Sequence, residues 1–233
     1  MPNNTPLHSW ERRKRMAEAF AGHLAPLLSY GAVRSELKSA LRREPYKAPA
    51  TNRQILLWLD GPGAPYADLY QDERVRNALS LTAGLMASFP TARTLKARWD
   101  TYARSHPASS GEHDAHGTND RRGSRLDLGL ALAEADRKEI NKNKAGTVPG
   151  AMSPDRMTPR EKRLMQLCRT DTDRLPRHLF SVLSYLHGQK CLLPHWPRMA
   201  ADIEWRMRAP DAVALKWQES YLTPPVWRRD TQR

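Results

Sequence analysis

Cysteine is scarce in this chain of 233 residues, and long apolar runs are missing. Cys168 and Cys191 are the only two thiols; they are too few for a disulfide framework, so we expect both to be free in a reducing cytoplasm. The amino-terminal residues have no apolar segment after their first charges, and we expect no secretory signal. No apolar run approaches the roughly 20 residues that cross a bilayer. These absences predict a soluble, cytoplasmic protein without a membrane partner.

Catalytic and metal-binding motifs are also lacking. There is no GxSxG nucleophile motif, and Gly61-Pro62-Gly63 is not followed by the Gly-Lys-Ser/Thr of a phosphate-binding loop. His187, Cys191 and His195 recur every four residues, but a glycine and a proline interrupt that segment and no CxxC or HExxH accompanies it. We therefore predict a non-enzyme that needs no metal and no cofactor. An enzyme with an unrecognised acidic site, such as a nuclease, stays open as a less favoured alternative.

What the chain does have is positive charge. Lys and Arg number 38 against 25 Asp and Glu, which gives a net charge of +13 and favours a polyanionic partner, nucleic acid above all. Residues 1–53 hold ten basic and four acidic side chains, a net charge of +6. Residues 121–177 hold fourteen and eight, again +6, whereas residues 54–100 are neutral. Two separate basic blocks predict a surface track for phosphate groups.

The apolar residues recur at helical spacing, and β-branched residues are sparse. Met16, Phe20 and Leu24 begin the pattern in a first helix, in which Pro26 predicts a kink or a break near Ala25. Further helices are expected near residues 32–43, 55–59, 72–89, 90–102, 125–140, 176–187, 196–207 and 210–222. Most of the seven Trp lie at helical spacing from other apolar residues, which indicates that they anchor the core.

Polar segments divide these helices into groups. Residues 105–123 lack large apolar side chains and predict a linker, and residues 139–158 form a second polar insertion. Thr158, Pro159 and Glu161 have the spacing of a capping box that starts another helix. The prediction is an all-α protein with two small helical bundles, residues 1–104 and 124–233, joined by the polar linker.

The strongest local signal for a binding surface is a stripe of cations in the second predicted helix. Arg34, Lys38 and Arg42 are four residues apart, so they share one side of the helix, and Arg43 extends its edge. Like charges at this spacing destabilise an isolated helix by about 0.2–0.5 kcal/mol per pair. We therefore expect the compensating negative charge to come from a ligand, although a basic surface without a specific partner would have the same pattern.

The second basic block supplies further candidates. Its cations include Arg121, Arg122, Arg125, Arg137, Lys138, Lys142, Lys144, Arg160, Lys162, Arg163, Arg169, Arg174 and Arg177. Aromatic residues are not interleaved with them, which disfavours base stacking and favours contacts with the phosphate backbone. We choose Arg121, Arg122, Arg125, Arg163 and Arg177 as binding candidates, while a solvated helix face would account for about half of the block.

Several motifs come in a distinctive order. The carboxy-terminal half contains Leu175-Pro176-Arg177-His178-Leu179, then Asp202-Ile203-Glu204-Trp205, then Leu215-Lys216-Trp217 with Tyr221 behind it. Upstream lie the basic helix with Arg34 and the run Leu128-Gly129-Leu130-Ala131-Leu132-Ala133. In this order the sequence resembles the CasB family, the small subunit of the type I-E CRISPR Cascade surveillance complex. Leu130 departs from the family, which commonly has a basic residue there.

The resemblance implies a non-catalytic, all-helical subunit in antiviral defence. Its partners would be the other Cascade subunits, a second copy of itself, the crRNA and the target DNA. Its basic face would hold the guide–target heteroduplex and the displaced strand and so stabilise the R-loop, which needs charge and shape rather than catalytic residues. The alternative from another class is a stand-alone helical DNA-binding regulator or architectural protein.

Overall fold

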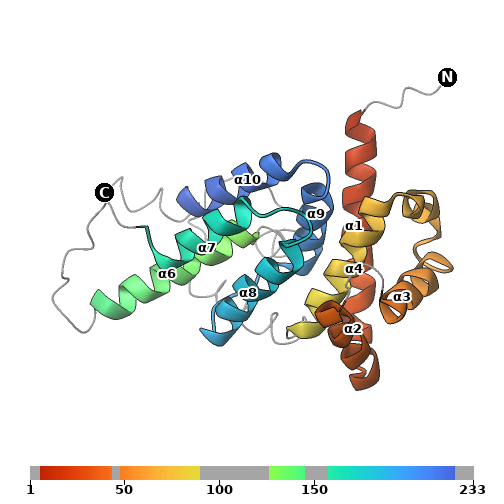
Figure 1. Ribbon diagram of the computed structural model, residues 1–233, viewed down its shortest axis with the longest axis horizontal. Coiled ribbons are helices and arrows are strands. Elements are labelled where there is room, and N and C mark those ends of the chain that lie inside the picture. Colours follow the sequence, from red (N-terminus) through yellow and green to blue (C-terminus); the bar gives the residue numbers. More distant parts are fainter. Residues whose placement is uncertain (1–5, 44–47, 90–125, 145–156, 224–233) are drawn as a thin grey trace, which may run out of the picture. The chain divides into compact units, whose positions relative to one another are not determined.

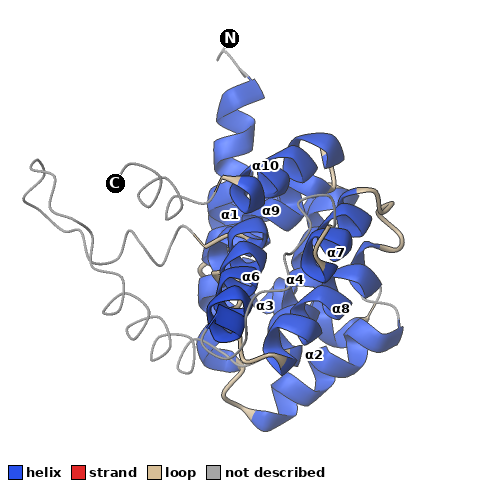
Figure 2. Ribbon diagram, turned by 90° about the vertical axis from the view of Figure 1, so that its left-hand side faces the viewer, coloured by secondary structure: helices blue, strands red, loops and turns tan. Residues whose placement is uncertain are grey.

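A computed structural model describes residues 6–43, 48–89, 126–144 and 157–223 (Figure 1). Its elements are α1 (Pro6–Leu27), α2 (Gly31–Arg43), α3 (Pro49–Leu59), the 3₁₀ helix η1 (Ala64–Gln71), α4 (Glu73–Ser88), α6 (Leu128–Lys144), α7 (Pro159–Cys168), α8 (Leu175–Gly188), α9 (Trp196–Arg206) and α10 (Pro210–Leu222). The described ranges contain helices and loops and no strand, so the predicted all-α class is confirmed (Figure 2).

The helices form two compact units. The first contains α1 to α4, η1 and α9, and the second contains α6, α7, α8 and α10. The chain passes between them at Pro194–His195 and at Ala209–Pro210. This division differs from the predicted bundle of residues 124–233, because α9 packs with the amino-terminal helices. The predicted linker, residues 105–123, lies outside the described residues, as does the predicted helix after Pro90.

The first unit, which we call unit 1, is built around α4. This helix contacts α1, α2, α3, η1 and α9, and every residue from Ala78 to Ala87 is buried. The apolar stripe of α1 includes Met16, Phe20 and Leu24, each at most 1% exposed. Phe20 meets Trp58 of α3 with ring centroids 5.1 Å apart. The stripe that sequence periodicity predicted is therefore the core face of α1.

Helix α1 is continuous to its last turn. It continues through Ala25 to Leu27, with Pro26 inside its last turn, so of the kink or break expected near Ala25 the break is not present. A proline this close to the end removes only a bond of the final turn. The backbone then turns, with Ser29 and Tyr30 donating to the carbonyls of Pro26 and Leu27. The 3₁₀ helix η1 was missed altogether, because Gly and Pro around residues 61–65 predict only a turn.

Two glycines and a buried acid fix the packing in unit 1. A Cβ on Gly84 of α4 would lie 2.8 Å from the Cβ of Leu41. Helix α2 can therefore pack this close to α4 because Gly84 has no side chain. Glu204 of α9 is fully buried, accepts a hydrogen bond from Arg208 at 2.7 Å and forms a salt bridge with Arg13 of α1 at 3.2 Å. Arg208 also reaches Asp72, the residue that caps α4, at 2.8 Å. A Cβ on the second glycine, Gly63, would strike the Trp58 ring at 2.5 Å.

The second unit, unit 2, depends on the close approach of α6 and α10. A Cβ on Gly129 of α6 would lie 1.9 Å from the backbone oxygen of Trp217, so only glycine fits. Trp217 itself is fully buried. Asp127 precedes α6 and accepts from the amide of Leu130 and, at 2.7 Å, from the hydroxyl of Ser220 in α10. The Leu-Gly run and the closing Trp motif thus pack directly against each other.

A buried polar network joins α6, α7 and α10. The capping box predicted at Thr158 is present, with both reciprocal bonds to Glu161. The hydroxyl of Thr158 also donates to Asp136 of α6 at 2.8 Å. Tyr221 of α10 donates to the same carboxylate, and Arg160 pairs with it at 2.7 Å. Because Asp136 is only 6% exposed, this carboxylate ties three helices together away from water.

Candidate nucleic-acid interface

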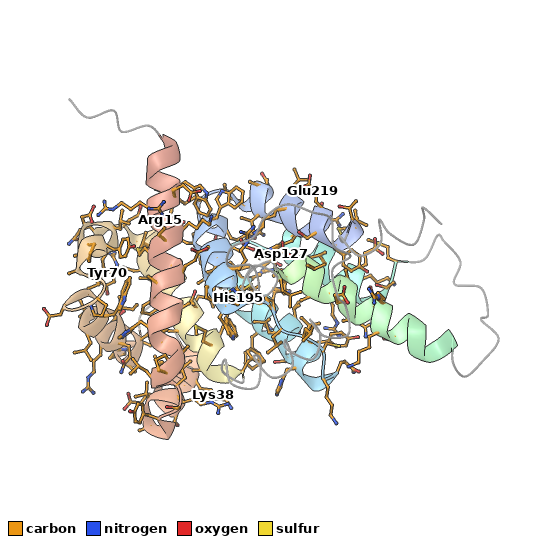
Figure 3. All side chains as sticks on the ribbon, turned by 180° about the vertical axis from the view of Figure 1, so that it is seen from behind. Arg15, Lys38, Tyr70, Asp127, His195 and Glu219 are labelled. Atoms are coloured by element: carbon orange, nitrogen blue, oxygen red, sulfur yellow. The ribbon has the colours of Figure 1, made fainter. Side chains whose placement is uncertain are left out.

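Two described cations of helix α2, Arg34 and Lys38, lie along the edge of its buried side. Its inner side carries Leu37 and Leu41, both buried against the unit. Arg34 is exposed and Lys38 is half-exposed beside these leucines, and their four-residue spacing puts both cations on one side of the helix. Figure 3 shows the Lys38 side chain projecting from this helix. The sequence therefore identified two cations that share one helix side.

Arg34 is held in place by the end of α4. Its Nε donates to the backbone oxygen of Ala87 at 3.0 Å. A guanidinium carries five N–H donors, so this single bond orients the group and leaves donors for a ligand. Neither Arg34 nor Lys38 forms a salt bridge with any acid in the described part of the chain. Nothing in the described ranges thus neutralises these two charges.

The remaining candidates of the first basic block lie at the end of the same helix. Arg42 and Arg43 belong to the last turn of α2, but their side chains are outside the described residues. The candidates Arg121, Arg122 and Arg125 also lie outside the described ranges. Their roles therefore stay predictions from the sequence.

The first turns of α1 show how misleading a count of basic residues can be. Arg12 is bidentate to Asp68 at 2.6 Å, Arg13 pairs with buried Glu204, and Lys14 lies 3.8 Å from Glu11. Arg15 is exposed and, among the described residues, has no such acid partner. It projects from α1 in Figure 3. Sequence reasoning missed Arg15, because in the sequence it looks the same as the three cations before it.

In unit 2 the candidate Arg163 stacks on an aromatic ring. Its Cζ lies 4.5 Å from the ring centroid of Tyr185 in α8. A cation over a ring face is stabilised by about 0.5–1 kcal/mol at an exposed site, and the planar guanidinium is thereby oriented. Arg177, also in α8, is exposed. Arg163 and Arg177 are thus on the surface, whereas Arg160 of the same block is buried.

Arg160 must be removed from the basic surface that the sequence suggested. It is 4% exposed and pairs with Asp136 at 2.7 Å and with Glu139 at 2.6 Å. Burial alone would lower the pKa of the guanidinium, but hydrogen bonds to Asp136 and Glu139 outweigh it, so the pKa is raised. Arg160 is permanently charged and already neutralised by acids. It stabilises unit 2 and is not available to a phosphate.

Metal and membrane sites are not evident in the described ranges. No group of three or more His, Cys, Asp or Glu is placed to hold a metal ion in that part of the chain. Cys191 is buried and Cys168 is half-buried, and both are free thiols. None of the described helices is both long and apolar enough to span a bilayer.

Comparison with known proteins agrees with the motif order. A model of the family described as CRISPR-associated protein Cse2 matches residues 33–222. The crystal structure of CasB from M. ruber has the same fold, with a TM-score of 0.58 and 18% identity over 94% of this chain and 98% of that one. No curated protein sequence matches significantly.

Two further solved structures are similar. One is a chain of a structure described as a CRISPR RNA-guided surveillance complex, with a TM-score of 0.57 and 20% identity over 95% of this chain and 99% of that chain. The other is a chain of such a complex in a pre-nicking state, with a TM-score of 0.55 and 23% identity over 94% and 99%. At these identities the structures establish the fold, and the family model establishes the relationship: the chain belongs to the Cse2 family, also called CasB, as its motifs indicated.

Proposed function

We propose that this chain is the small subunit of a type I-E Cascade complex and binds the phosphate backbones of the crRNA and the target DNA. As a Cse2-family protein, it is a non-catalytic subunit of a CRISPR RNA-guided surveillance complex. The contacts with nucleic acid, the second copy of the subunit and the stabilisation of the R-loop are the parts that we propose.

The observation that carries this proposal is the unneutralised pair Arg34 and Lys38. They share one side of α2, and Arg34 is oriented by the carbonyl of Ala87. A phosphate backbone needs only long cationic side chains at suitable positions, without base contacts. The exchange of one duplex for another in an R-loop is nearly balanced in free energy, so a few backbone contacts can shift it. Arg163 and Arg177 would add such contacts in unit 2.

The alternative, a stand-alone DNA-binding regulator, is less well supported. A base-reading helix places polar side chains at its start, where they reach base edges in the major groove. Helix α2 begins with Gly31-Ala32-Val33 and carries cations afterwards. This pattern fits sequence-independent binding.

The test is a charge reversal in the assembled complex. Arg34→Glu and Lys38→Glu, with Arg42→Glu as a third change, should leave α2 folded because Leu37 and Leu41 stay buried and Glu and Lys have similar helix propensity. Each lost charge-assisted contact costs about 1.5–3 kcal/mol before screening by salt. We expect target-DNA affinity to fall at least about tenfold while the subunit composition, checked by native mass measurement, is unchanged.

A matched control uses exposed cations of the same unit outside the stripe. Arg53→Glu with Arg74→Glu changes the net charge of unit 1 at two exposed positions of α3 and α4. R-loop formation by this control should stay close to that of the wild type. Equal R-loop stability in the stripe variant and the control would refute the role of α2. Failure of the wild-type chain to enter the complex would refute the proposal as a whole.

A further inference from the structure

Unit 2 has a hollow of about 460 Å³ between α7 and the beginning of α8. One side of α7 contributes Lys162 and Met165, and Arg169 follows at its carboxy-terminal cap. The turn into α8 contributes Asp171 and Arg174, and Met157 lies before α7. The volume is within the range of about 300–1,000 Å³ that is usual for ligand sites.

The three cations of this hollow are not used by the fold. Lys162, Arg169 and Arg174 are exposed, and none forms a salt bridge with an acid of the described segments. Arg160, two residues before Lys162, is the opposite case, because it is buried between Asp136 and Glu139. The cations of the hollow therefore present positive charge to a ligand.

The lining also contains exposed apolar surface. Met157 is 43% exposed, and Met165 is half-buried in the same lining. Gln218 of α10 donates to the sulfur of Met165 at 3.6 Å. Methionine adapts its flexible, polarisable side chain to varied apolar partners and is frequent at surfaces that bind peptides. The hollow thus combines positive charge with adaptable apolar surface.

This combination fits a peptide better than a nucleic acid. Among the described residues the lining has one aromatic ring, the imidazole of His178, and no Phe, Tyr or Trp, so it offers a single small ring for base stacking. A phosphodiester has only acceptors and so offers the Asp171 carboxylate no hydrogen-bond donor, whereas a peptide can donate its backbone N–H groups to it. Acidic peptide motifs are commonly recognised by groups of Arg side chains.

We propose that the hollow between α7 and α8 docks an acidic peptide segment of a partner protein. Asp or Glu side chains of that segment pair with Lys162, Arg169 and Arg174. An apolar residue between them packs against Met157 and Met165. None of Arg34, Lys38, Arg163 and Arg177, which carry the proposed nucleic-acid contacts, lines this hollow, so the inference goes beyond the proposed function.

The test observes the methionine methyl groups of the full chain by nuclear magnetic resonance. The chain has eight methionines, and ¹³C-methyl labelling gives each a separate probe. The Met157→Leu and Met165→Leu variants assign the two signals from the hollow. The ligand probe is a synthetic peptide in which Asp and Glu flank a single Leu. We expect both methyl signals to shift saturably, while those of Met86 and Met199, buried in unit 1, stay in place.

Charge reversal then tests the cations. Arg169→Glu with Arg174→Glu should weaken the peptide at least about tenfold, since each lost pairing with a charged group is worth roughly 1.5–3 kcal/mol before screening. Lys190→Glu, an exposed cation of the same unit outside the hollow, should leave the affinity within about twofold, since surface charges at a distance are screened. A helical circular-dichroism spectrum and a thermal midpoint close to those of the wild type verify that the variants are folded.

Two further probes decide between classes of ligand. The same peptide with Asn and Gln in place of the acids should not shift the signals of Met157 and Met165. Short oligo-dT should shift them only at higher concentration than the acidic peptide. The inference is overturned if the acidic peptide leaves both signals unmoved, or if oligo-dT moves them at an equal or lower concentration.

Discussion

Each unit contains a buried acid that pairs with arginine, but the surroundings of the two acids differ. In unit 1 the carboxylate of Glu204 is fully buried, while the side chains of its partners Arg13 and Arg208 are 17% and 19% exposed. In unit 2 the side chains of Asp136 and Arg160 are only 8% and 5% exposed. The unit 1 network therefore reaches water at its cations, and the unit 2 pair does not. A missing partner should cost more in unit 2.

The same contrast applies to the two basic blocks. Both have a net charge of +6, yet the described cations separate into paired and unpaired groups within each block. Arg12 and Arg13 are bound by acids, and Arg34 and Lys38 are not. The net charge of a segment thus says little about the charge that a ligand meets.

The largest expected effect is the loss of the buried acid in unit 2. Asp136→Ala should destabilise the protein by about 3–5 kcal/mol, because Arg160 is left buried with only Glu139 and the hydroxyls of Thr158 and Tyr221 lose their acceptor. Glu204→Ala in unit 1 should cost about 1–3 kcal/mol, since its arginines reach water and Arg208 keeps Asp72. Urea denaturation, with hydrogen exchange to assign the loss to one unit, measures both.

The control for these two substitutions is Glu139, the second acid that pairs with Arg160. The side chain of Glu139 is 55% exposed, so Glu139→Gln should cost less than about 1 kcal/mol. A smaller loss for Asp136→Ala than for Glu204→Ala would contradict the proposed difference between the units.

The second effect concerns close helix packing. Gly129→Ala places a Cβ at 1.9 Å from the oxygen of Trp217, so α6 and α10 must separate, at a cost of about 1–3 kcal/mol or more. Gly22→Ala in α1 is the matched change in unit 1: its Cβ meets nothing within 4 Å, and it should stabilise by about 0.5–1 kcal/mol. Thermal denaturation should show midpoints that move in opposite directions. Equal shifts would mean that α6 can move away without loss.

Much of the fold was predictable, because it depends on local patterns. The apolar stripe of α1 and the capping box of α7 are spelled out by residues within one or two turns of each other. The partner of α9 was not predictable. Met199 and Ile203 reveal an apolar face of that helix, but they do not say which bundle covers it. Gly129 likewise looks like any helical glycine until Trp217 is placed against it.

The candidate site was predictable to a smaller extent. The spacing of Arg34 and Lys38 on one helix was enough to place both on the same side. Arg160 and Arg163 are only three residues apart, yet one is buried and the other stacks on Tyr185. The difference arises because Asp136, on another helix, binds only the first, and a single sequence does not show that pairing.

A smaller effect is expected on the salt dependence of nucleic-acid binding, in which the loss of an unpaired cation should matter more than the loss of a paired one. We expect the isolated chain to bind duplexes and single strands weakly and without sequence preference, with steep salt dependence. Lys38→Gln should reduce the slope of log affinity against log salt by about 0.7–0.9. Lys14→Gln removes the same charge from a lysine that lies near Glu11, and should change the slope less. Titrations with scrambled sequences at several salt concentrations check both. A clear preference for one short duplex would favour a regulator instead.

The smallest effect is a dependence of unit 1 on acidic pH. Burial would raise the pKa of Asp72, but hydrogen bonds from Arg208 and the amide of Arg74 outweigh it, so the pKa lies below its ordinary value of 3.8. A carboxyl group with a lowered pKa stabilises the fold above that value, and this contribution is lost as the pH falls below it. Burial raises the pKa of Glu18 above its ordinary value of 4.5, so its ionisation opposes folding, and acid relieves this cost.

At neutral pH, Asp72→Asn should therefore lower the urea midpoint slightly, and Glu18→Gln should raise it. The Asp72 side chain is 41% exposed, so its effect should be no more than about 1 kcal/mol, and it should vanish once the pH is well below 3.8. A difference between Asp72→Asn and the wild type that persists unchanged at such a pH would show that Asp72 acts through packing and not through its charge.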